Sequence, residues 1–593
     1  MKWLHSFLFL FLMIFLAQAQ FSNEQVQEKQ FENSALYFQR FYLNTFGLIN
    51  FTAVAPGFFE DSFTRLKLNP AFGLQDTSRQ STFYVDFRSE RETELPRQFV
   101  QPVYERATVM PDYFIPPDPR WYRISRSEPE PVLSAGLRSW LASKLHLTLA
   151  YQLIYKEEPF YRQPVYFYAY NPYYDAFNQR MLPGEVGIPS VIRNKQNDQA
   201  LTRAHLLAGY LSYRLNSVFD LGFGADFVQH KRQADYLTLY NGEYGQDAFS
   251  SRENTRNLNY HHADYFTGIN WHASSAWQFG WQAGWLKGNV KQHEVFDDSS
   301  HYSTEQGFNF SHQMETSDYR HQGDRYYSTL TFQYSADQQN KLVGFLNYNY
   351  LKNDIANRAS TCNLARAEYN FRNGLEYNLH QNHSTLTDRR SSCGNLKEHF
   401  WEAMITVFMK QSSKTRMHFG LYYSYLDGRK KISEPLFYEA YSSYYNEGDD
   451  QNGHFVYQNT LLRREDKTLY WTYRYNRQSI QMPIYWWYKI NNNLAFFTII
   501  NKLWNAWETD ENTDAWYKER YDLHDGQEEL KQNFIERYDD GAGRHYTKDM
   551  TDLALGFEVF LLKDVTIRYL VNPDFLDADL TISQWWLSLS ARF

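Results

Sequence analysis

Apolar and polar residues alternate with a period of two along most of this chain. From Leu145 to Leu153, leucine and tyrosine occupy the odd positions, while histidine, threonine, alanine and glutamine occupy the even ones. The segment WQFGWQAGW, residues 277–285, repeats the pattern with tryptophan and phenylalanine on one face and glutamine and glycine on the other. Because successive side chains of a strand point to opposite faces, the pattern predicts half-buried β-strands.

The strands recur in pairs around very short turns. Such pairs span 132–155, 204–227, 327–350, 401–425, 484–503 and 553–570, and WQFGWQAGW belongs to one more pair. Asn373-Gly374 favours a two-residue type I′ turn and so adds one more hairpin, although its parity also permits a single straight strand and an odd count. With strands at Phe83 to Arg88 and Ile582 to Phe593, the sequence predicts about 18 strands, in a range of about 14 to 20.

Long polar connections alternate with the short turns. They cover about 91–131, 156–202, 230–261, 288–324, 428–479 and 505–549. A soluble β-sandwich could carry the same alternation, but it has no reason to sort its loops by length. An all-β, transmembrane, antiparallel up-and-down β-barrel sorts its loops in this way, with short turns and both termini on the periplasmic side and long loops outside.

The N-terminal residues predict two further segments before the barrel. Lys2, an apolar run from Leu4 to Leu16 and the small-residue site Ala17-Gln18-Ala19 are typical of a signal peptide, residues 1–19. An uncleaved anchor is the alternative, but the run is shorter than the ~20 residues of a spanning helix. Residues 20–80 are expected to form a helical, plug-like segment in the barrel mouth or at its rim, with a helix at Asn23 to Phe46. Residues 81–593 then form the barrel.

The composition of the chain agrees with a transmembrane β-barrel. Aromatic residues make up 18% of the chain, with 48 Tyr, 45 Phe and 16 Trp. The mean hydropathy of -0.65 does not oppose a membrane location, because only alternate residues of a barrel strand face lipid. The net charge of -8 excludes a strongly basic nucleic-acid surface.

The last strand carries the most specific resemblance. Trp585, Leu587, Leu589, Ala591 and Phe593 resemble the terminal signal of Gram-negative outer-membrane β-barrel proteins. The resemblance implies a location in the bacterial cell outer membrane, contact with outer-membrane lipid and recognition by the barrel-assembly machinery during biogenesis.

A narrower resemblance lies in RLKLNPAFGL. Asn69, Pro70 and Ala71 resemble the Asn-Pro-Ala element before the first strand of long-chain fatty-acid transporters and of related type IX secretion barrels. None of the substrate residues of those transporters can be placed in this chain. The large plug of TonB-dependent receptors is not apparent either.

Charged residues at the expected inward positions are the candidate lumen lining. They are Asp86, Arg88, Arg138, Asp220, Asp226, Arg366, Glu368, Glu402, Glu558 and Arg568. Both charge signs occur, so no strong ion selectivity follows. The set fits a water-filled channel, or equally a self-neutralising network that fills a closed barrel.

The two cysteines, Cys362 and Cys393, are expected at the outer ends of strands. A disulfide closing an external loop is the favoured interpretation, and two free thiols are the alternative. His380 and His383 nearby lack a zinc-binding spacing, so no metal site is expected. No cofactor is expected.

The sequence therefore predicts a porin-like channel or transporter for small solutes or hydrophobic compounds. The alternative is a surface scaffold or adhesin whose tyrosine-rich loops bind a surface protein or lipoprotein. An enzyme is not expected, because His261 and His262 come without a recognisable nucleophile motif.

Overall fold

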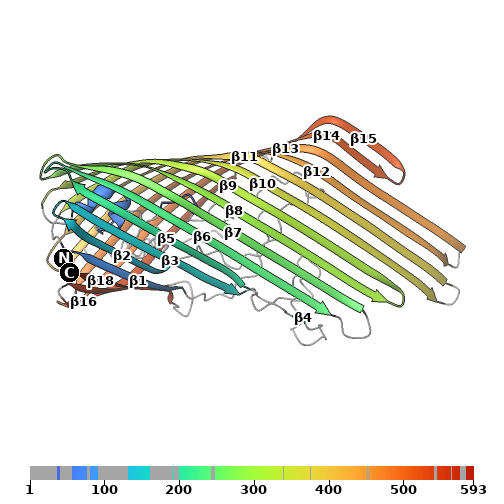
Figure 1. Ribbon diagram of the computed structural model, residues 1–593, viewed down its shortest axis with the longest axis horizontal. Helices are drawn as coiled ribbons and strands as arrows, with labels where there is room; N and C mark the ends of the chain where they lie inside the picture. Colours follow the sequence, from blue (N-terminus) through green and yellow to red (C-terminus); the bar gives the residue numbers. More distant parts are fainter. Residues whose placement is uncertain are drawn as a thin grey trace.

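A computed structural model gives the fold of most of the chain. It describes residues 37–40, 57–59, 61–75, 80–90, 131–159, 191–192, 199–241, 247–337, 340–373, 376–450, 453–539, 544–562, 564–573 and 582–593. Within these ranges nearly every residue after Ser81 lies in a β-strand (Figure 1).

The first nine strands are β1 (Thr82–Glu90), β2 (Pro131–Ala142), β3 (Leu145–Pro159), β4 (Val191–Ile192), β5 (Gln199–Arg214), β6 (Phe219–Asn241), β7 (Asp247–His272), β8 (Trp277–Thr304) and β9 (Gly307–Ser335). The next nine are β10 (Lys341–Asn373), β11 (Glu376–Lys410), β12 (Thr415–Asp450), β13 (Gly453–Lys489), β14 (Leu494–His524), β15 (Gln527–Asp539), β16 (Arg544–Leu562), β17 (Val565–Pro573) and β18 (Ile582–Arg592).

These strands close into an antiparallel barrel. Strand β1 pairs with both β2 and β18, and the Ser81 and Phe593 backbones exchange hydrogen bonds of 2.9 and 3.0 Å. Strands β4 and β15 lie outside the ring, because β3 pairs directly with β5 and β14 with β16. Eighteen strands less these two leaves sixteen in the ring. The expected resemblance to outer-membrane barrels is confirmed at this level, whereas the expected count of about 18 is wrong.

The difference in count comes from the Asn373-Gly374 turn. Strand β10 runs unbroken to Asn373, which pairs with Glu376 at the start of β11. The turn therefore joins the far ends of two long strands and adds no strand pair near the membrane. The polar segments 230–261, 288–324, 428–479 and 505–549, expected as loops, are likewise mostly strand. Both faces of these outer parts carry many polar residues, so the period-two signal fades while the backbone ladder continues.

The alternation itself is confirmed in the inner part of the barrel. Neighbouring residues on one strand differ sharply in exposure: Leu149 43% and Ala150 3%, Trp281 44% and Gln282 0%, Ile405 47% and Thr406 1%. The exposed member is apolar in each pair, as expected for a lipid-facing side chain. The final strand follows the same rule, because Leu587 is exposed and Ser588 is buried.

Strand length differs greatly around the ring. Strand β1 has 9 residues and β13 has 37, or about 30 and about 120 Å at ~3.3 Å per residue. The long strands therefore extend as a one-sided wall past the short ones (Figure 1). We call residues 376–392, 433–450, 453–470 and 512–539, on β11 to β15, the distal wall. Among the described helices, none has the length and apolar character needed to cross a membrane.

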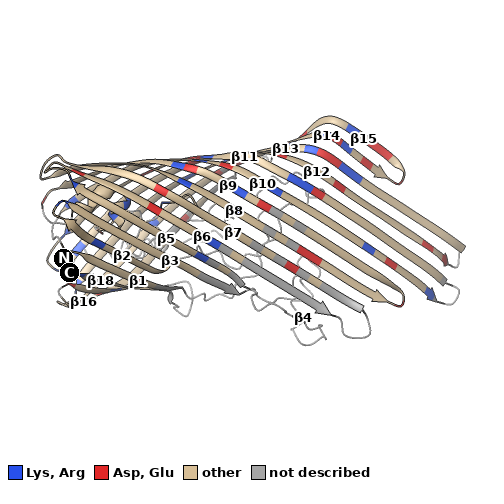
Figure 2. Ribbon diagram, viewed as in Figure 1, with Lys and Arg blue, Asp and Glu red and all other residues tan. Residues whose placement is uncertain are grey.

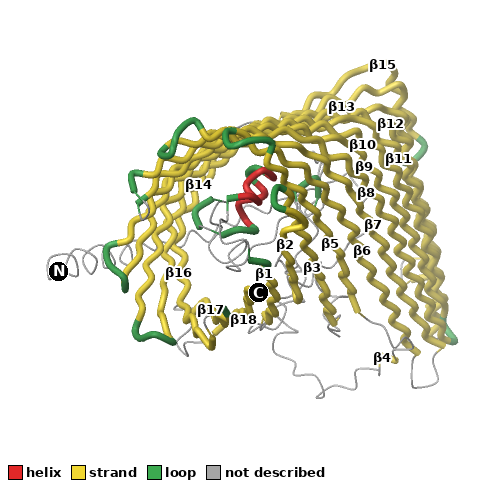
Figure 3. The backbone as a smooth tube through the Cα atoms, turned by 60° about the vertical axis from the view of Figure 1, so that its left-hand side comes forward, coloured by secondary structure: helices red, strands yellow, loops and turns green. Residues whose placement is uncertain are grey.

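Two short 3-10 helices precede the barrel strands. They are η1 (Thr64–Lys67) and η2 (Pro70–Leu74), and both lie inside the ring of strands (Figure 3). Of the helix expected at Asn23 to Phe46, only residues 37–40 are described, and they form a turn in which Phe38 has a φ of 55°. The predicted signal peptide lies outside the described residues.

Candidate functional site

The Asn-Pro-Ala element anchors the N-terminal segment inside the barrel. The Ala71 N–H donates to Asn69 Oδ1 at 2.9 Å, so Asn69 caps η2. The same side chain donates from Nδ2 to the backbone carbonyl of Ile269 at 2.8 Å and lies 3.4 Å from that of Trp281. Asn69 is fully buried. One amide therefore both starts the helix and ties it to β7 and β8.

Glycines on the facing strands make room for this contact. A Cβ at Gly222 would lie 2.2 Å from the Ala71 nitrogen, and one at Gly268 would lie 2.2 Å from Asn69 Oδ1. A Cβ at Gly280 would lie 2.7 Å from Asn69 Nδ2. The inward glycines of β6, β7 and β8 thus leave a hollow that larger side chains would fill. We call these three residues, Gly222, Gly268 and Gly280, the glycine nest.

Carbonyl groups of the segment are held by inward side chains of the barrel. Ser212 donates to the Pro70 carbonyl at 2.8 Å, and Arg138 donates to the Gly73 carbonyl at 3.0 Å. Arg214 donates to the Leu74 carbonyl at 3.2 Å. These bonds satisfy carbonyls that a short helix leaves without partners at its end. We call residues 61–75 with Tyr37 to Arg40 the plug.

An ion pair joins the earlier part of the plug to β7. Arg40 Nε lies 3.2 Å from Asp264 Oδ2, and Arg40 Nη1 donates to the Lys67 carbonyl at 2.8 Å. Its guanidinium also lies 4.1 Å from the centre of the Tyr327 ring. The Tyr327 hydroxyl donates to Asp264 at 2.8 Å. Sequence reasoning missed this pair, because Arg40 lay in a segment expected only to be helical.

Most of the predicted lumen residues do face the barrel interior. Asp86, Arg138, Asp220, Asp226 and Glu558 are buried, and Glu402 and Arg568 are half-buried. Five of these side chains pair with one another or with other inward groups, as the following contacts show: Tyr84 to Asp86 2.7 Å, Arg214 to Asp220 2.9 Å, His272 to Asp220 2.7 Å, Asn347 to Glu402 2.6 Å and Arg568 to Glu558 2.6 Å. These contacts favour the self-neutralising network over a row of free charges.

Two residues that were predicted to line the lumen lie elsewhere. Arg366 and Glu368 pair in register with His383 and Gln381, near the outer ends of β10 and β11. Arg366 is exposed. The prediction failed because it took these residues as part of a short membrane hairpin, whereas the strands continue far outward. The Arg88 side chain lies outside the described residues.

The expected disulfide is also wrong. Both Cys362 and Cys393 are free and exposed. They lie on neighbouring strands, but Cys393 pairs with Ala356, six residues from Cys362. At ~3.3 Å per residue this offset is about 20 Å, well beyond the ~7 Å Cα separation that a disulfide tolerates.

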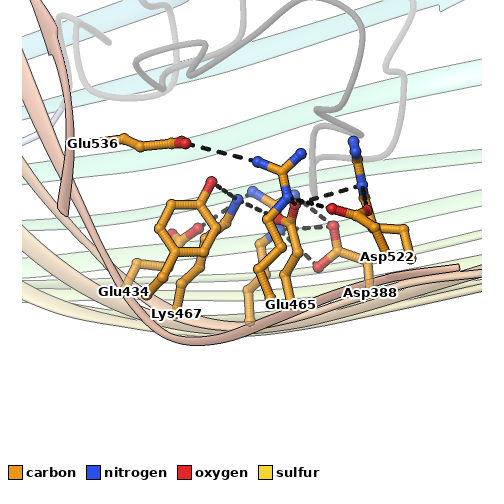
Figure 4. Close-up of polar contacts among 10 residues, drawn as sticks. Asp388, Glu434, Glu465, Lys467, Asp522 and Glu536 are labelled. Carbon is orange, nitrogen blue, oxygen red and sulfur yellow. Dashed lines mark hydrogen bonds and ion pairs between the residues drawn. The ribbon is translucent and has the colours of Figure 1, made fainter. Parts of the chain in front are cut away.

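A second polar cluster lies on the distal wall. Arg390 donates to Asp388 at 2.8 Å and approaches Glu434 at 3.4 Å (Figure 4). Arg390 precedes the inner end of β11 by twenty residues, about 66 Å along the strand, so it lies beyond a lipid-facing band of ~25 Å. Burial opposes the charge of Arg390, but Asp388 and Glu434 raise its guanidinium pKa above the ordinary value.

The cluster continues across β13 and β14. Lys467 lies 2.6 Å from Glu465, and burial lowers the pKa of its ammonium group although Glu465 offsets part of that effect. Arg463 lies 2.6 Å and Arg520 2.9 Å from Asp522. Burial opposes the charge of Asp522, yet the two arginines hold its pKa below the ordinary value. Acidic and basic groups gather over this part of the sheet (Figure 2).

No family model matches the sequence, and no curated protein is similar to it. Solved structures similar to the chain include a FadL homologue of Pseudomonas aeruginosa, with a TM-score of 0.34 and 10% identity over 93% of this chain and 98% of that one. Another is the toluene transporter TbuX of Ralstonia pickettii, with a TM-score of 0.27 and 9% identity over 89% and 92%. A third is the CymD monoaromatic hydrocarbon channel, with a TM-score of 0.24 and 10% identity over 69% and 98%. With TM-scores this low, the similarity does not indicate a function, and the barrel fold is established by the strand pairing instead.

Proposed function

We propose that the protein is an outer-membrane transporter for small solutes or hydrophobic compounds, closed at its periplasmic end by the plug. The observation that carries this proposal is the fit between Asn69 and the glycine nest of β6 to β8. Gly222, Gly268 and Gly280 keep a space inside the ring that a barrel filled only by its own side chains would not need.

The geometry of the barrel supports passage of a solute. A ring of this size exceeds the ~8 strands at which inward side chains alone fill the interior. The exposed apolar residues of its inner part, such as Trp281 and Ile405, suit a membrane exterior. Most of the plug's links to the strands are single hydrogen bonds, each contributing ~1 kcal/mol, so they can be exchanged when the plug moves.

Planar-bilayer recording tests the proposal. The full protein is expected to be closed or to open briefly, because the plug occupies the inner mouth. A variant lacking residues 20–78 is expected to show large, steady conductance. The replacement Asn69→Ala, which removes the cap and the bonds to β7 and β8, is expected to give an intermediate open fraction.

Circular dichroism must first show unchanged strand content in each variant. With folded protein, two outcomes contradict the proposal. If the deletion variant is silent, the barrel is filled by its own side chains. If the full protein conducts as much as the deletion variant, the plug does not close the channel.

A scaffold function is the second candidate, and the outer face of the distal wall favours it. Tyr470, Trp516 and Ile535 are exposed there, and the rings of Tyr470 and Trp516 lie 5.5 Å apart. Strand β15 pairs only with β14 among the described strands. Silent recordings combined with loss of a co-purifying surface protein in the variant Trp516→Ser would favour this function over transport.

A further inference from the structure

Inward residues at one level of the barrel form a continuous row. Asp264 pairs with Leu286, Leu286 with Arg325, Arg325 with Leu351, and Leu351 with Glu398. Leu286 and Leu351 are both buried and flank Arg325. The row thus places one cation between two apolar residues, with a carboxylate two strands away on either side.

Arg325 is buried, and no ion pair joins it to another residue in the part of the chain that the structure describes. Only 6% of the residue is exposed, and its Nε has no hydrogen-bond partner. The described part of the chain offers no carboxylate within ion-pair distance of it. A buried charge without a partner is costly, so such a group needs an explanation.

The nearest carboxylates already have other partners. Asp264 is bound by Arg40 and accepts a hydrogen bond from Tyr327. Glu398 accepts a hydrogen bond from the Tyr475 hydroxyl. Each of these carboxylates thus has another partner, and neither lies within ion-pair distance of the guanidinium of Arg325.

His262 supplies a second free donor beside this row. The Phe38 N–H donates to the Tyr260 hydroxyl, which lies 2.7 Å from His262 Nδ1. Since that hydroxyl already accepts from Phe38, its proton points to Nδ1, and the hydrogen of a neutral His262 must then lie on Nε2. His262 Nε2 is buried and has no partner.

Pairing in the sheet brings the two donors near each other. His262 pairs with Gly288 and Gly288 with Gly323, which is the next inward residue beyond Arg325. His262 is thus two strands from Arg325 and one inward position further out, about 10 Å across the sheet and about 7 Å along it. Arginine and histidine side chains can both reach a small molecule that spans part of this distance.

We propose that Arg325 and His262 form a binding site for the carboxylate of a small solute inside the barrel. The carboxylate accepts from the guanidinium of Arg325, and His262 Nε2–H donates to the same group or to a neighbouring oxygen of the solute. The row already carries Asp226, Asp264 and Glu398, so a monoanion adds less negative charge to it than a dianion would. This site rests on the proposed transport function and specifies its substrate class.

Ligand binding to the detergent-solubilised full chain tests the site without requiring transport. Sodium benzoate is expected to raise the melting temperature of the wild type and to give a measurable Kd by calorimetry. Benzamide, its neutral analogue, and inorganic phosphate are expected to bind at least tenfold more weakly. The variant Arg325→Gln is expected to lose at least tenfold in benzoate affinity, and Arg325→Lys to retain part of it.

Arg320→Gln is the matched control, because Arg320 lies on the same strand but is exposed on the outer face. Without ligand, Arg325→Gln should melt at a higher temperature than the wild type, since it removes an uncompensated buried charge. The site is refuted if benzoate binds neither form, if it binds Arg325→Gln as tightly as the wild type, or if ligand-free Arg325→Gln melts lower. A silent bilayer recording with intact benzoate binding would instead refute transport alone.

Discussion

At the scale of single residues, the plug is held by close contact with glycine rather than by charge alone. Asn69 is fully buried, and the backbone of Ala71 lies where a side chain on Gly222 would have to be. An inward glycine here is needed because any Cβ would overlap the plug. Adding a single methyl group to one of the glycines of the nest is therefore expected to displace the plug.

Gly268→Ala tests this sensitivity. Its Cβ would lie 2.2 Å from Asn69 Oδ1, so the plug should lose about 1–3 kcal/mol of docking free energy. We expect faster proteolysis of the N-terminal segment in folded protein, with the barrel strands unaffected. Gly209→Ala is the control, because its new Cβ would meet only Leu149 Cδ2 at 3.7 Å. Equal proteolysis of the two variants would show that the nest does not position the plug.

The sequence predicted part of this site. The Asn-Pro-Ala resemblance pointed to Asn69, and the alternation placed Asp220, Asp226 and Glu558 inside. Arg40 and Arg325 were not predicted, because the significance of each depends on which side chains on distant strands face it. Period-two patterns show which way a side chain points but not whether it finds a partner.

At the scale of elements, ion pairs replace apolar packing once the strands leave the membrane. On the distal wall, Arg390 joins β11 to β12, and Asp522 joins β13 to β14. A small apolar cluster that includes Leu436 and Tyr517 lies beside them. Because lipid no longer covers the outer face, cross-strand charges and these few apolar contacts hold the sheet together.

Arg390→Met tests the role of this network. The replacement leaves Asp388 and Glu434 buried without their cation, which typically costs about 3–5 kcal/mol. We expect faster hydrogen exchange in the distal wall and unchanged exchange near the inner turns. Arg389→Met, at the exposed neighbouring position, should leave both regions as they are. Exchange that is unchanged in Arg390→Met would mean that the ion pairs do not stabilise the wall.

These outer strands also mark where sequence patterns stop being informative. The inner strand pairs were predicted because lipid imposes an apolar residue at every second position. From 428 to 479 both faces carry many polar residues, so the segment was expected to be a loop, although its described residues are β-strand. Backbone pairing with a neighbouring strand stabilises it there, and that pairing leaves no period in one strand's own sequence.

At the scale of the whole molecule, one side of the barrel is far longer than the other. Strands β10 to β14 rise beyond the short β1, β17 and β18, and the plug lies at the end where β1 begins and β18 ends (Figures 1 and 3). The plug at that end and the tall wall at the other give the molecule two distinct surfaces. Loop sorting in the sequence predicted the barrel and the side on which its last strand ends, but it did not predict the wall.

The central claim is that one face of each inner strand meets lipid while the other meets the plugged interior. Ile405 and Thr406 test it most directly, because they are neighbours on β11 with 47% and 1% exposure. With Cys362 and Cys393 replaced by serine, single cysteines at 405 and 406 are labelled with a fluorophore in proteoliposomes. A quencher confined to the lipid phase should strongly quench the label at 405 and leave the label at 406 bright. Equal quenching, or stronger quenching at 406, would contradict the account.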